Sequence, residues 1–336
     1  MTLAISGTTG ITLAGQFDSA STFGFRNRII NGLMAIDQRN AAASQTFTAA
    51  AALAYSVDRW YGFCTGANVT GQQVAGSTTP SVTQFRYRFT GAASVATVGF
   101  GQRIEQKNSY DLAGSTCTLS ADLAISATLT TVTWTASYAT TTADTFGTLA
   151  SPTVTQIATG TFTVSATVTN FSANISVPAA ATTGIQIVFT VGALTAGLTW
   201  TIGNVQFEKG STATSFDYRP FGTELALCQR YGYAVNSCFT GFANGTTSVD
   251  TSINFPVTMR SNPTLSAGTA VMLAFGTGGG FTQSSVNSSL PTGITQNGGA
   301  LRFSNFVGLT ANAVYVVNNN ATGTVTVYSS FLSAEL

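Results

Sequence analysis

The stretch DYRPFGTELALCQRYG, Asp217–Gly232, divides the sequence into two parts that are both rich in short alternating runs. Thr223 is a suitable N-cap, because its hydroxyl can accept a bond from the first free backbone N–H groups of a helix. Glu224 places a carboxylate in the first turn, where it complements the helix dipole. Gly232 is the residue type that commonly ends a helix. We therefore predict a short connecting helix over 220–232.

This helix is predicted to be a joint between two β-rich domains, because strand-like patterns end before it and restart after it. Neighbouring opposite charges at Asp58–Arg59 and Asp217–Arg219 predict local ion pairs. The residues expected to pack between the domains are Leu225, Leu227, Cys228 and Tyr231.

The predicted first domain covers residues 25–219. It begins with Asn27–Asn40, where apolar residues alternate around an Asn-Gly turn signal. Alternating runs follow at 55–64, 85–89, 94–105, 115–126, 130–138, 160–169, 184–191 and 198–208, with a linker expected up to Pro178. About nine or ten such runs without a helical pattern predict an antiparallel jelly roll. We expect Trp60 in its core, the alternative being a platform for a ligand.

The predicted second domain covers residues 233–336. Its alternating runs are shorter, and a hairpin turn is expected at 318–323 between two of them. The fold class is therefore all-β: a jelly-roll sandwich, a short helix and a second, smaller β-sandwich. Residues 1–24, rich in Gly, Thr, Ser and Ala, are expected to form an N-terminal arm that either docks on a partner or serves as a flexible leader.

Charge is unusually scarce, since only 7% of the 336 residues are charged and the net charge is +1. Nucleic-acid binding requires clustered Lys and Arg, which this chain lacks, so we expect no nucleic-acid partner. No apolar run approaches about 18 residues, and the first ten residues do not resemble a secretory signal. We expect no membrane insertion. So few charges favour a protein whose surface is largely covered by identical copies, or one that works outside the cell.

The four cysteines, Cys64, Cys117, Cys228 and Cys238, form no CxxC pair, and histidine is absent. This composition excludes zinc-finger spacing and catalysis by Ser-His-Asp or Cys-His groups. We expect four reduced thiols, the alternative being a disulfide between Cys228 and Cys238. We predict no metal site, no cofactor and no catalytic residues.

A family resemblance rests on several segments taken together. They are NRIINGLMAIDQRN (27–40), YSVDRWYGF (55–63), VQFEKGSTATSFDYRPFGTELALCQRYG (205–232), FPVTMRSNPTLS (255–266) and the closing AEL (334–336). Together, and most specifically through ELALCQRY, they resemble tailed-bacteriophage virion appendages, the tail fibres and spikes. Such proteins commonly carry a second tyrosine where this chain has Gly232, which we expect to loosen the helix end.

The resemblance implies a virion structural protein, assembled in the bacterial cytoplasm, with a jelly roll like that of a carbohydrate-binding module. It implies a fibre, spike or decoration appendage that contributes to host attachment. A homotrimer is expected, attached to other virion proteins through the N-terminal arm. The alternatives are a glycan-binding, lectin-like adhesin and a polysaccharide depolymerase. We expect no enzymatic activity, because only 12 acidic residues are present and none forms a repeated cleft pattern.

Glycan binding by such a domain would use exposed aromatic rings that stack on sugar rings. The candidates are Tyr110, in a polar turn, and Trp134 with Tyr138, which share one side of a predicted strand. Burial in the core is the alternative for Trp134 and Tyr138.

Overall fold

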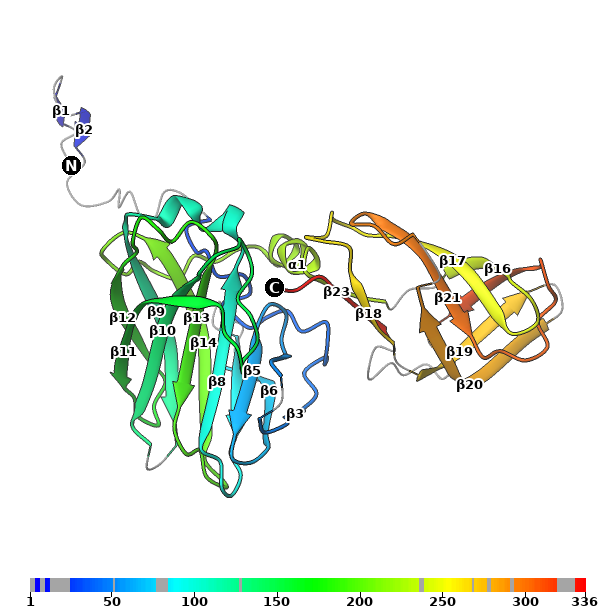
Figure 1. Ribbon diagram of the computed structural model, residues 1–336, viewed down its shortest axis with the longest axis horizontal. Coiled ribbons are helices and arrows are strands. Elements are labelled where there is room, and N and C mark those ends of the chain that lie inside the picture. The colour runs from blue at the N-terminus through cyan, green and yellow to red at the C-terminus, as the bar shows by residue number, and fades with distance from the viewer. Residues whose placement is uncertain are drawn as a thin grey trace.

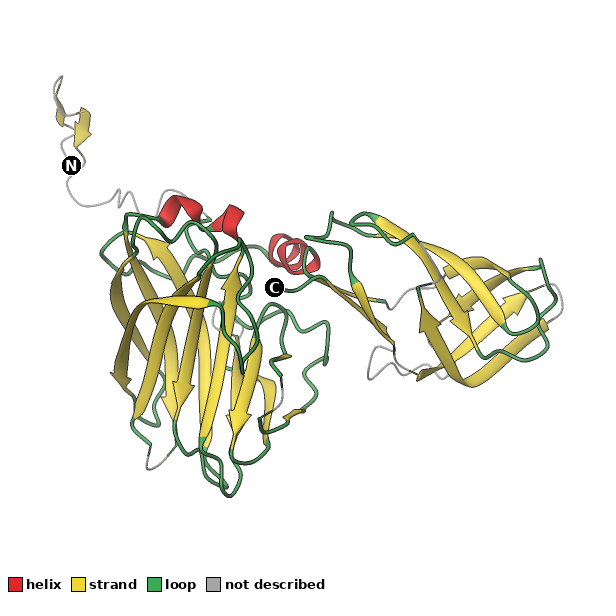
Figure 2. Cartoon of the chain, in the orientation of Figure 1, coloured by secondary structure: helices red, strands yellow, loops and turns green. Residues whose placement is uncertain are grey.

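The computed structural model describes residues 4–6, 10–12, 25–50, 52–76, 84–126, 129–235, 239–267, 269–276, 279–290, 293–318 and 330–336. Within these ranges the chain is mostly β-strand, with one α-helix, α1 (Phe221–Gln229), and two short 3-10 helices (Figure 2). The expected all-β class is therefore confirmed. Figure 1 shows two β units side by side, with α1 between them.

The first unit is a sandwich of two six-stranded antiparallel sheets, as expected for a jelly roll. The first sheet has the strand order β11-β10-β13-β8-β5-β4, and the second sheet has the order β12-β9-β14-β7-β6-β3. The strands are β3 (Gln45–Phe47), β4 (Ala54–Tyr55), β5 (Tyr61–Thr65), β6 (Val69–Ala75), β7 (Phe85–Thr90), β8 (Thr97–Ile104), β9 (Thr116–Ile125), β10 (Thr131–Ala139), β11 (Val154–Thr163), β12 (Thr169–Ser176), β13 (Ile185–Val191) and β14 (Thr199–Lys209).

Aromatic rings fill the space between the two sheets. Trp60 is fully buried and stacks on Phe100, with ring centroids 4.9 Å apart, and Phe100 stacks in turn on Tyr87 at 4.8 Å. Phe89 stacks on the equally buried Trp200 at 5.4 Å. The expected core position of Trp60 is confirmed. Such a large apolar core explains how a chain with so few charges folds stably.

Two parts of this unit differ from the sequence expectation. The stretch expected as a linker before Pro178 contains β12, an edge strand whose side chains are mostly exposed and whose sequence therefore lacks a clear alternation. Conversely, Asn27–Asn40 contains turns and no strand. Its expected turn is present, since the N–H of Met34 donates to the carbonyl of Asn31 at 3.0 Å.

Helix α1 lies within the expected range of 220–232 but is capped differently from the expectation. Pro220 is the N-cap, and its carbonyl accepts from the N–H groups of Thr223 and Glu224. Thr223 therefore lies inside the helix and does not cap it. The helix ends at Gln229, and Gly232 belongs to the following strand, β15 (Gly232–Ala234), so Gly232 does not determine the helix end.

The second unit contains a six-stranded closed barrel, with the order β16-β17-β21-β20-β19-β22. A smaller three-stranded sheet, β15-β23-β18, connects it to the joint. The expected second β unit therefore closes on itself rather than stacking two open sheets. The strands are β16 (Phe239–Ala243), β17 (Ser248–Asn254), β18 (Thr264–Ala267), β19 (Thr269–Gly276), β20 (Gly279–Ser289), β21 (Gly298–Ser304), β22 (Val314–Asn318) and β23 (Ser330–Ser333). Most of the expected hairpin turn at 318–323 lies outside the described residues.

Two strands of the N-terminal arm are described, β1 (Ala4–Ser6) and β2 (Gly10–Thr12). They pair antiparallel, with Ile5 opposite Ile11. The remainder of residues 1–24 lies outside the described residues, and so does the predicted attachment role. Among the helices of the described chain, none is both long and apolar enough to span a membrane.

Candidate functional site

The segments that carry the family resemblance meet at the joint between the two units. The loop before β3 is fixed there by Asn31, whose side chain accepts from the N–H of Ile36 and donates to the carbonyls of Ile36 and Asp58. Its backbone N–H donates to Glu224 of α1. Gly32 is required beside it, because a Cβ there would lie 2.1 Å from the Val205 carbonyl oxygen. The Asn-Gly pair thus anchors the loop to both the sandwich and the helix.

The ion pairs at the joint are not those expected from sequence neighbours. Arg219 pairs with Glu224 at 3.1 Å rather than with Asp217, which accepts from the backbone N–H of Asn27. Arg219 also donates to the carbonyl of Ile29 at 3.1 Å. The Arg219 guanidinium therefore connects the loop before β3 to α1.

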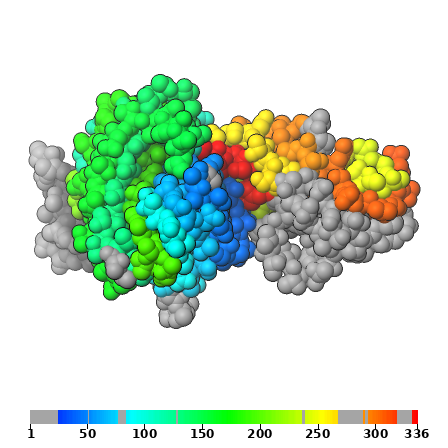
Figure 3. All heavy atoms as spheres, turned by 60° about the horizontal axis from the view of Figure 1, so that its bottom comes forward, coloured from blue at the N-terminus to red at the C-terminus, as the bar shows by residue number. Residues whose placement is uncertain are grey.

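Arg59 likewise does not pair with Asp58. Its partner is Glu335, in the closing AEL segment, and the exposed fractions of the two side chains are 1% and 5%. The Arg59 guanidinium also lies 3.5 Å from the centroid of the Tyr231 ring and donates to the carbonyl of Arg103 at 2.6 Å. Figure 3 shows the C-terminal residues, in red, between the two units.

Asp58 is buried without a direct cationic partner. Its carboxylate accepts from the backbone N–H of Gln38 at 3.1 Å and from the Gln38 side chain, which also reaches the carbonyl of Gly232. Burial raises the pKa of Asp58 to about 7, against an opposing contribution from Arg39. Asp58 is therefore a pH-sensitive group within the joint.

The predicted joint residues gather in one small apolar cluster. Cys228 and Tyr231 are buried with Ile30 and Ile36, and Leu225 and Leu227 pack against them half-buried. Burial raises the pKa of the Cys228 thiol well above its ordinary value. Cys64, Cys117 and Cys228 are free thiols, which contradicts a Cys228–Cys238 disulfide, and Cys238 lies outside the described residues.

Glu105 completes the joint from the sandwich side. It pairs with Arg230 at 2.9 Å and accepts from the hydroxyl of Tyr231 at 2.9 Å. The joint is thus a dense polar network around an apolar cluster. The polar groups of the joint bond mainly to one another, and these bonds connect the loop before β3, the helix and the C-terminal segment.

The three predicted glycan-binding residues do not form one site. Tyr110 is 59% exposed, on a 3-10 helix formed by Tyr110–Leu112. Trp134 is only 6% exposed, because its side of β10 faces the core, where it packs over Gly160 of β11. Tyr138 is half-buried against the same core. For Trp134 the alternative, burial in the core, is therefore the one that the structure shows.

Sequence reasoning missed a groove on the opposite face of this first sheet. The Phe63 ring lies across Gly99 of the next strand, where an added Cβ would lie 2.1 Å from the ring. The Tyr61 hydroxyl lies over Gly101 in the same way. Two glycines two residues apart on β8 thus make room for two aromatic side chains two residues apart on β5. The sequence carries this pattern as YGF at 61–63 and GFG at 99–101, and the matched spacing could have indicated that the two strands pair in this way.

Polar groups stand beside these rings. Arg103 donates to the side-chain oxygen of Gln186 at 3.0 Å and to the carbonyls of Gly147 and Leu336. The groove, of about 130 Å³, is lined by Leu53, Tyr61, Phe63, Arg103, Phe146, Thr148, Leu149, Pro152, Gln186 and Val188. Tyr61 and Phe146 are buried, so Phe63 supplies the accessible aromatic surface. A half-buried ring with fixed amide and guanidinium groups beside it suits a sugar ring.

The same sheet face continues into a threonine-rich hollow. From Phe63 and Gly99 the cross-strand row passes to Thr190 and then Thr133. Here a hollow of about 440 Å³ is lined by Thr97, Leu129, Thr130, Thr131, Thr133, Thr190, Val191 and Gly192. Hydroxyl groups in a fixed array can donate to and accept from sugar hydroxyls.

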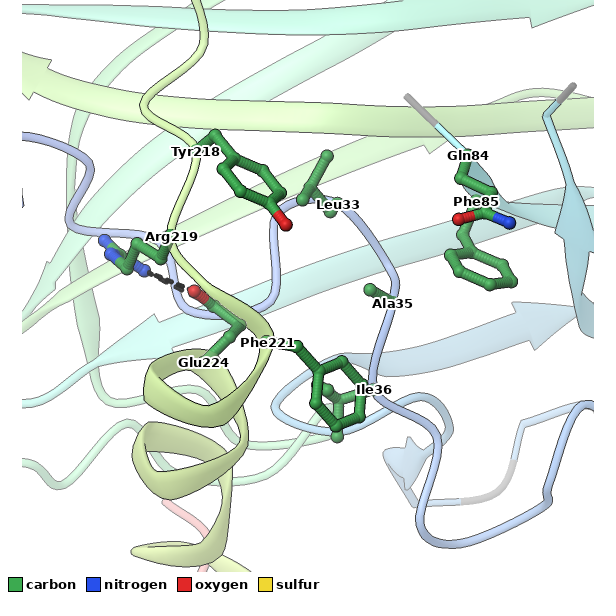
Figure 4. Close-up of a pocket in the computed structure, with 9 residues that line it drawn as sticks. All are labelled: Leu33, Ala35, Ile36, Gln84, Phe85, Tyr218, Arg219, Phe221 and Glu224. Carbon is green, nitrogen blue, oxygen red and sulfur yellow. Dashed lines mark hydrogen bonds and ion pairs between the residues drawn. The ribbon is translucent and has the colours of Figure 1, made fainter. Parts of the chain in front are cut away.

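A second kind of pocket lies at the start of α1 (Figure 4). It is lined mainly by apolar side chains, and the Arg219–Glu224 pair closes one side. Tyr218 and Phe221 at its rim are 52% and 62% exposed.

No protein-family model matches the chain, and no curated protein matches it. The fold itself defines an all-β protein with a jelly-roll sandwich. Solved structures with a similar fold include the enzymatically active domain of bacteriophage CBA120 tailspike protein 4, at 15% identity and a TM-score of 0.34. That alignment covers 55% of this chain but only 22% of the tailspike chain.

Others are carbohydrate-binding proteins by title. The C-terminal family 22 carbohydrate binding module of Clostridium thermocellum Xyn10B aligns at 13% identity and a TM-score of 0.33, covering 48% of this chain and 91% of the module. A putative sugar binding protein from Bacteroides thetaiotaomicron aligns at 12% identity and a TM-score of 0.32, covering 55% of this chain and all of that one. Similarity at this level does not transfer a function.

Proposed function

We propose that the protein is a structural appendage of a bacteriophage virion, a fibre, spike or decoration protein, whose jelly roll binds glycans on the host surface. The observation that carries the binding part is the Phe63 ring, laid flat on Gly99 beside the Arg103–Gln186 pair. An aromatic face with adjacent planar hydrogen-bonding groups matches a pyranose, which has apolar C–H faces and a rim of hydroxyls.

The virion part of the proposal is supported by the sequence resemblance. The segments that carry it are those that build the joint, through Asn31, Arg59, Glu224 and Glu335. The resemblance is thus a set of residues with one shared structural task, rather than scattered matches. The low charge of the chain is also consistent with work outside the cell in a multi-copy particle.

We propose binding without catalysis. Glycoside hydrolysis generally uses two carboxyl groups about 5–10 Å apart. None of the residues that line the groove is acidic. Of the acidic residues that are close in sequence, Glu105 pairs with Arg230 and Asp111 pairs with Arg28 at 2.7 Å.

The binding proposal is tested by applying the full chain to an array of bacterial lipopolysaccharides and capsular polysaccharides. We expect binding to at least one of them, reduced at least tenfold by Phe63→Ala. Tyr110→Ala, which removes an exposed aromatic ring outside the groove, should leave binding unchanged. An array without binding, or binding insensitive to Phe63→Ala, contradicts the proposal. New reducing ends from the bound glycan would favour the depolymerase.

We propose that several copies assemble, as a homotrimer, and that Tyr218 and Phe221 lie in the contact between them. Exposed aromatic rings around an apolar pocket mark protein interfaces more often than free surface. Multiple copies would also raise the avidity of weak glycan binding. Light scattering should give a trimer for the natural chain and smaller species for Phe221→Ser. A monomeric natural chain, absent from purified particles by mass spectrometry, contradicts both assembly and the virion assignment.

A further inference from the structure

A second hollow of binding character lies on the outer wall of the C-terminal barrel, away from the jelly-roll groove. Strands β16, β17 and β21 are neighbours there (Figure 1). Register places Phe242 opposite Asp250 and Asp250 opposite Arg302, so the three side chains form one row across the strands. Their inward neighbours Val249 and Leu301 are fully buried, which confirms that this row points outward.

The next outward row holds small side chains. Ser252 faces Ala300 across the same pair of strands, and Thr240 lies beside them on β16. A row of large groups beside a row of small ones leaves a hollow of about 640 Å³. This lies within the range of roughly 300–1,000 Å³ that is common for small-molecule sites.

Phe242 is unusual for an exposed position. Its ring is 55% exposed, next to Val314, which is 59% exposed on the neighbouring strand. The backbone on either side is held in the barrel, with Phe242 paired to both β17 and β22. The ring therefore stands on a rigid backbone. Little conformational entropy is lost there when a ligand binds.

The charged pair next to the ring is equally well fixed. Arg302 contacts Asp250 through two parallel bonds, Nε to Oδ1 at 2.6 Å and Nη2 to Oδ2 at 2.7 Å. Asn244 donates to the same carboxylate at 3.1 Å. The hydrogen bond from Arg302 lowers the pKa of Asp250, so the carboxylate stays an ionised acceptor. The two charges also cancel, so the hollow offers no net attraction to an anion.

We propose that this hollow, formed around Phe242, Asp250 and Arg302, is a second saccharide site that takes a neutral pyranoside. The sugar ring lies on Phe242, and its vicinal hydroxyls donate to Asp250 and accept from Arg302, with Ser252 and Asn254 at the rim. A hollow without net positive charge does not compensate the desolvation of a carboxylate, so uronic and sialic acids should bind more weakly. Together with the jelly-roll groove, each chain then carries two glycan sites, but the barrel site does not require the groove to function.

The test is saturation-transfer NMR on the full chain with methyl glycosides of glucose, galactose, mannose, rhamnose and N-acetylglucosamine, and with methyl glucuronide as the charged counterpart. We expect transfer to at least one neutral glycoside and at least tenfold weaker binding of the glucuronide than of the glucoside. Phe242→Ala and Arg302→Lys should each weaken the neutral ligand at least tenfold. The second variant keeps the charge and removes the two-bond geometry.

Two controls separate this site from other causes. Val307→Ala removes a barrel side chain that is 71% exposed and outside the hollow, and should leave binding unchanged. Phe63→Ala should abolish groove binding yet leave the Phe242-dependent signal. The proposal is overturned if no neutral glycoside binds, if binding survives both barrel variants, or if the glucuronide binds as tightly as the neutral ligand. Loss of the signal with Phe63→Ala alone would assign all binding to the groove.

Discussion

Two Arg–carboxylate pairs in this protein have the same chemistry and opposite surroundings. Arg59 and Glu335 meet inside the joint, with 1% and 5% of their side chains exposed. Arg302 and Asp250 meet on the barrel wall, with 31% and 17% exposed. Removing one member of a buried pair leaves an uncompensated charge, whereas an exposed pair contributes little to stability. The first pair is therefore a structural requirement, and the second is free to serve a ligand.

The same contrast explains where the scarce charge of this chain is used. Four of the six ion pairs in the described part of the chain lie at the joint, formed by Arg39, Arg59, Arg219 and Arg230 with their carboxylate partners. The sheet face with the groove uses threonine, glutamine and one arginine instead. Most of the ion pairs thus lie at the joint, and only Arg28–Asp111 and Arg302–Asp250 lie elsewhere in the described part of the chain.

Glu335→Ala should have the largest effect. It leaves Arg59 buried opposite Tyr231 without its carboxylate, which costs about 3–5 kcal/mol of unfolding free energy. For a unit of about 200 residues, a loss of that free energy corresponds to a fall in Tm of roughly 10 °C, which calorimetry would measure. Arg28→Ala, which breaks the more exposed Arg28–Asp111 pair, is the matched control and should change Tm by no more than about 3 °C. Equal effects of the two variants would show that burial does not separate these pairs.

The four residues predicted at the joint cluster with Ile30 and Ile36 of the first unit, but the ion pairs around them could not be predicted. Leu225, Leu227, Cys228 and Tyr231 could be placed there because the strand pattern stops and restarts around them. Glu335 could not be assigned to Arg59, because 276 residues separate the two and only the fold brings them together.

The groove on the first sheet was missed for a related reason. Alternation does not say which face of a two-sided sheet is the core, so both positions stayed open for Trp134.

The next effect depends on pH. The pKa of Asp58 is about 7 in the folded chain and 3.8 ordinarily, so the folded state holds a proton that the unfolded state releases. This contribution to stability is complete below pH 3.8 and is lost as pH rises towards 7. We expect Tm to be several degrees higher at pH 5 than at pH 8.

Asp58→Asn should remove most of that pH dependence, since the amide can still bond Gln38 but cannot ionise. The groups that act electrostatically on Asp58 are Arg39, Asp37 and Glu335, and the chain has no histidine to titrate in this window. An unchanged slope of Tm against pH in Asp58→Asn would assign the effect to another group.

Packing at the joint is tested by Gly232, the first residue of β15. A Cβ at this position would lie 2.6 Å from the Phe331 ring, on whose face Arg39 sits at 4.0 Å. Gly232→Tyr should therefore cost about 1–3 kcal/mol of unfolding free energy by overpacking. Gly222→Ala is the control, because a Cβ there meets nothing within 4 Å and alanine favours the helix. A tolerated tyrosine would show that β15 and β23 can separate without loss.

Asp250→Asn should have the smallest effect on stability, because it breaks a pair that stays partly exposed to solvent. We expect the unfolding free energy to change by less than about 1 kcal/mol. The lowered pKa of Asp250 means that the pair contributes at neutral pH and that its contribution is lost as pH falls through the folded pKa. The difference in Tm between the variant and the natural chain should therefore shrink towards pH 3. Glycoside binding should nevertheless fall at least tenfold. The contrary outcome is that Asp250→Asn destabilises the barrel as strongly as Glu335→Ala destabilises the joint. Both pairs would then be structural, and the Asp250–Arg302 pair would no longer support a binding site on the barrel wall.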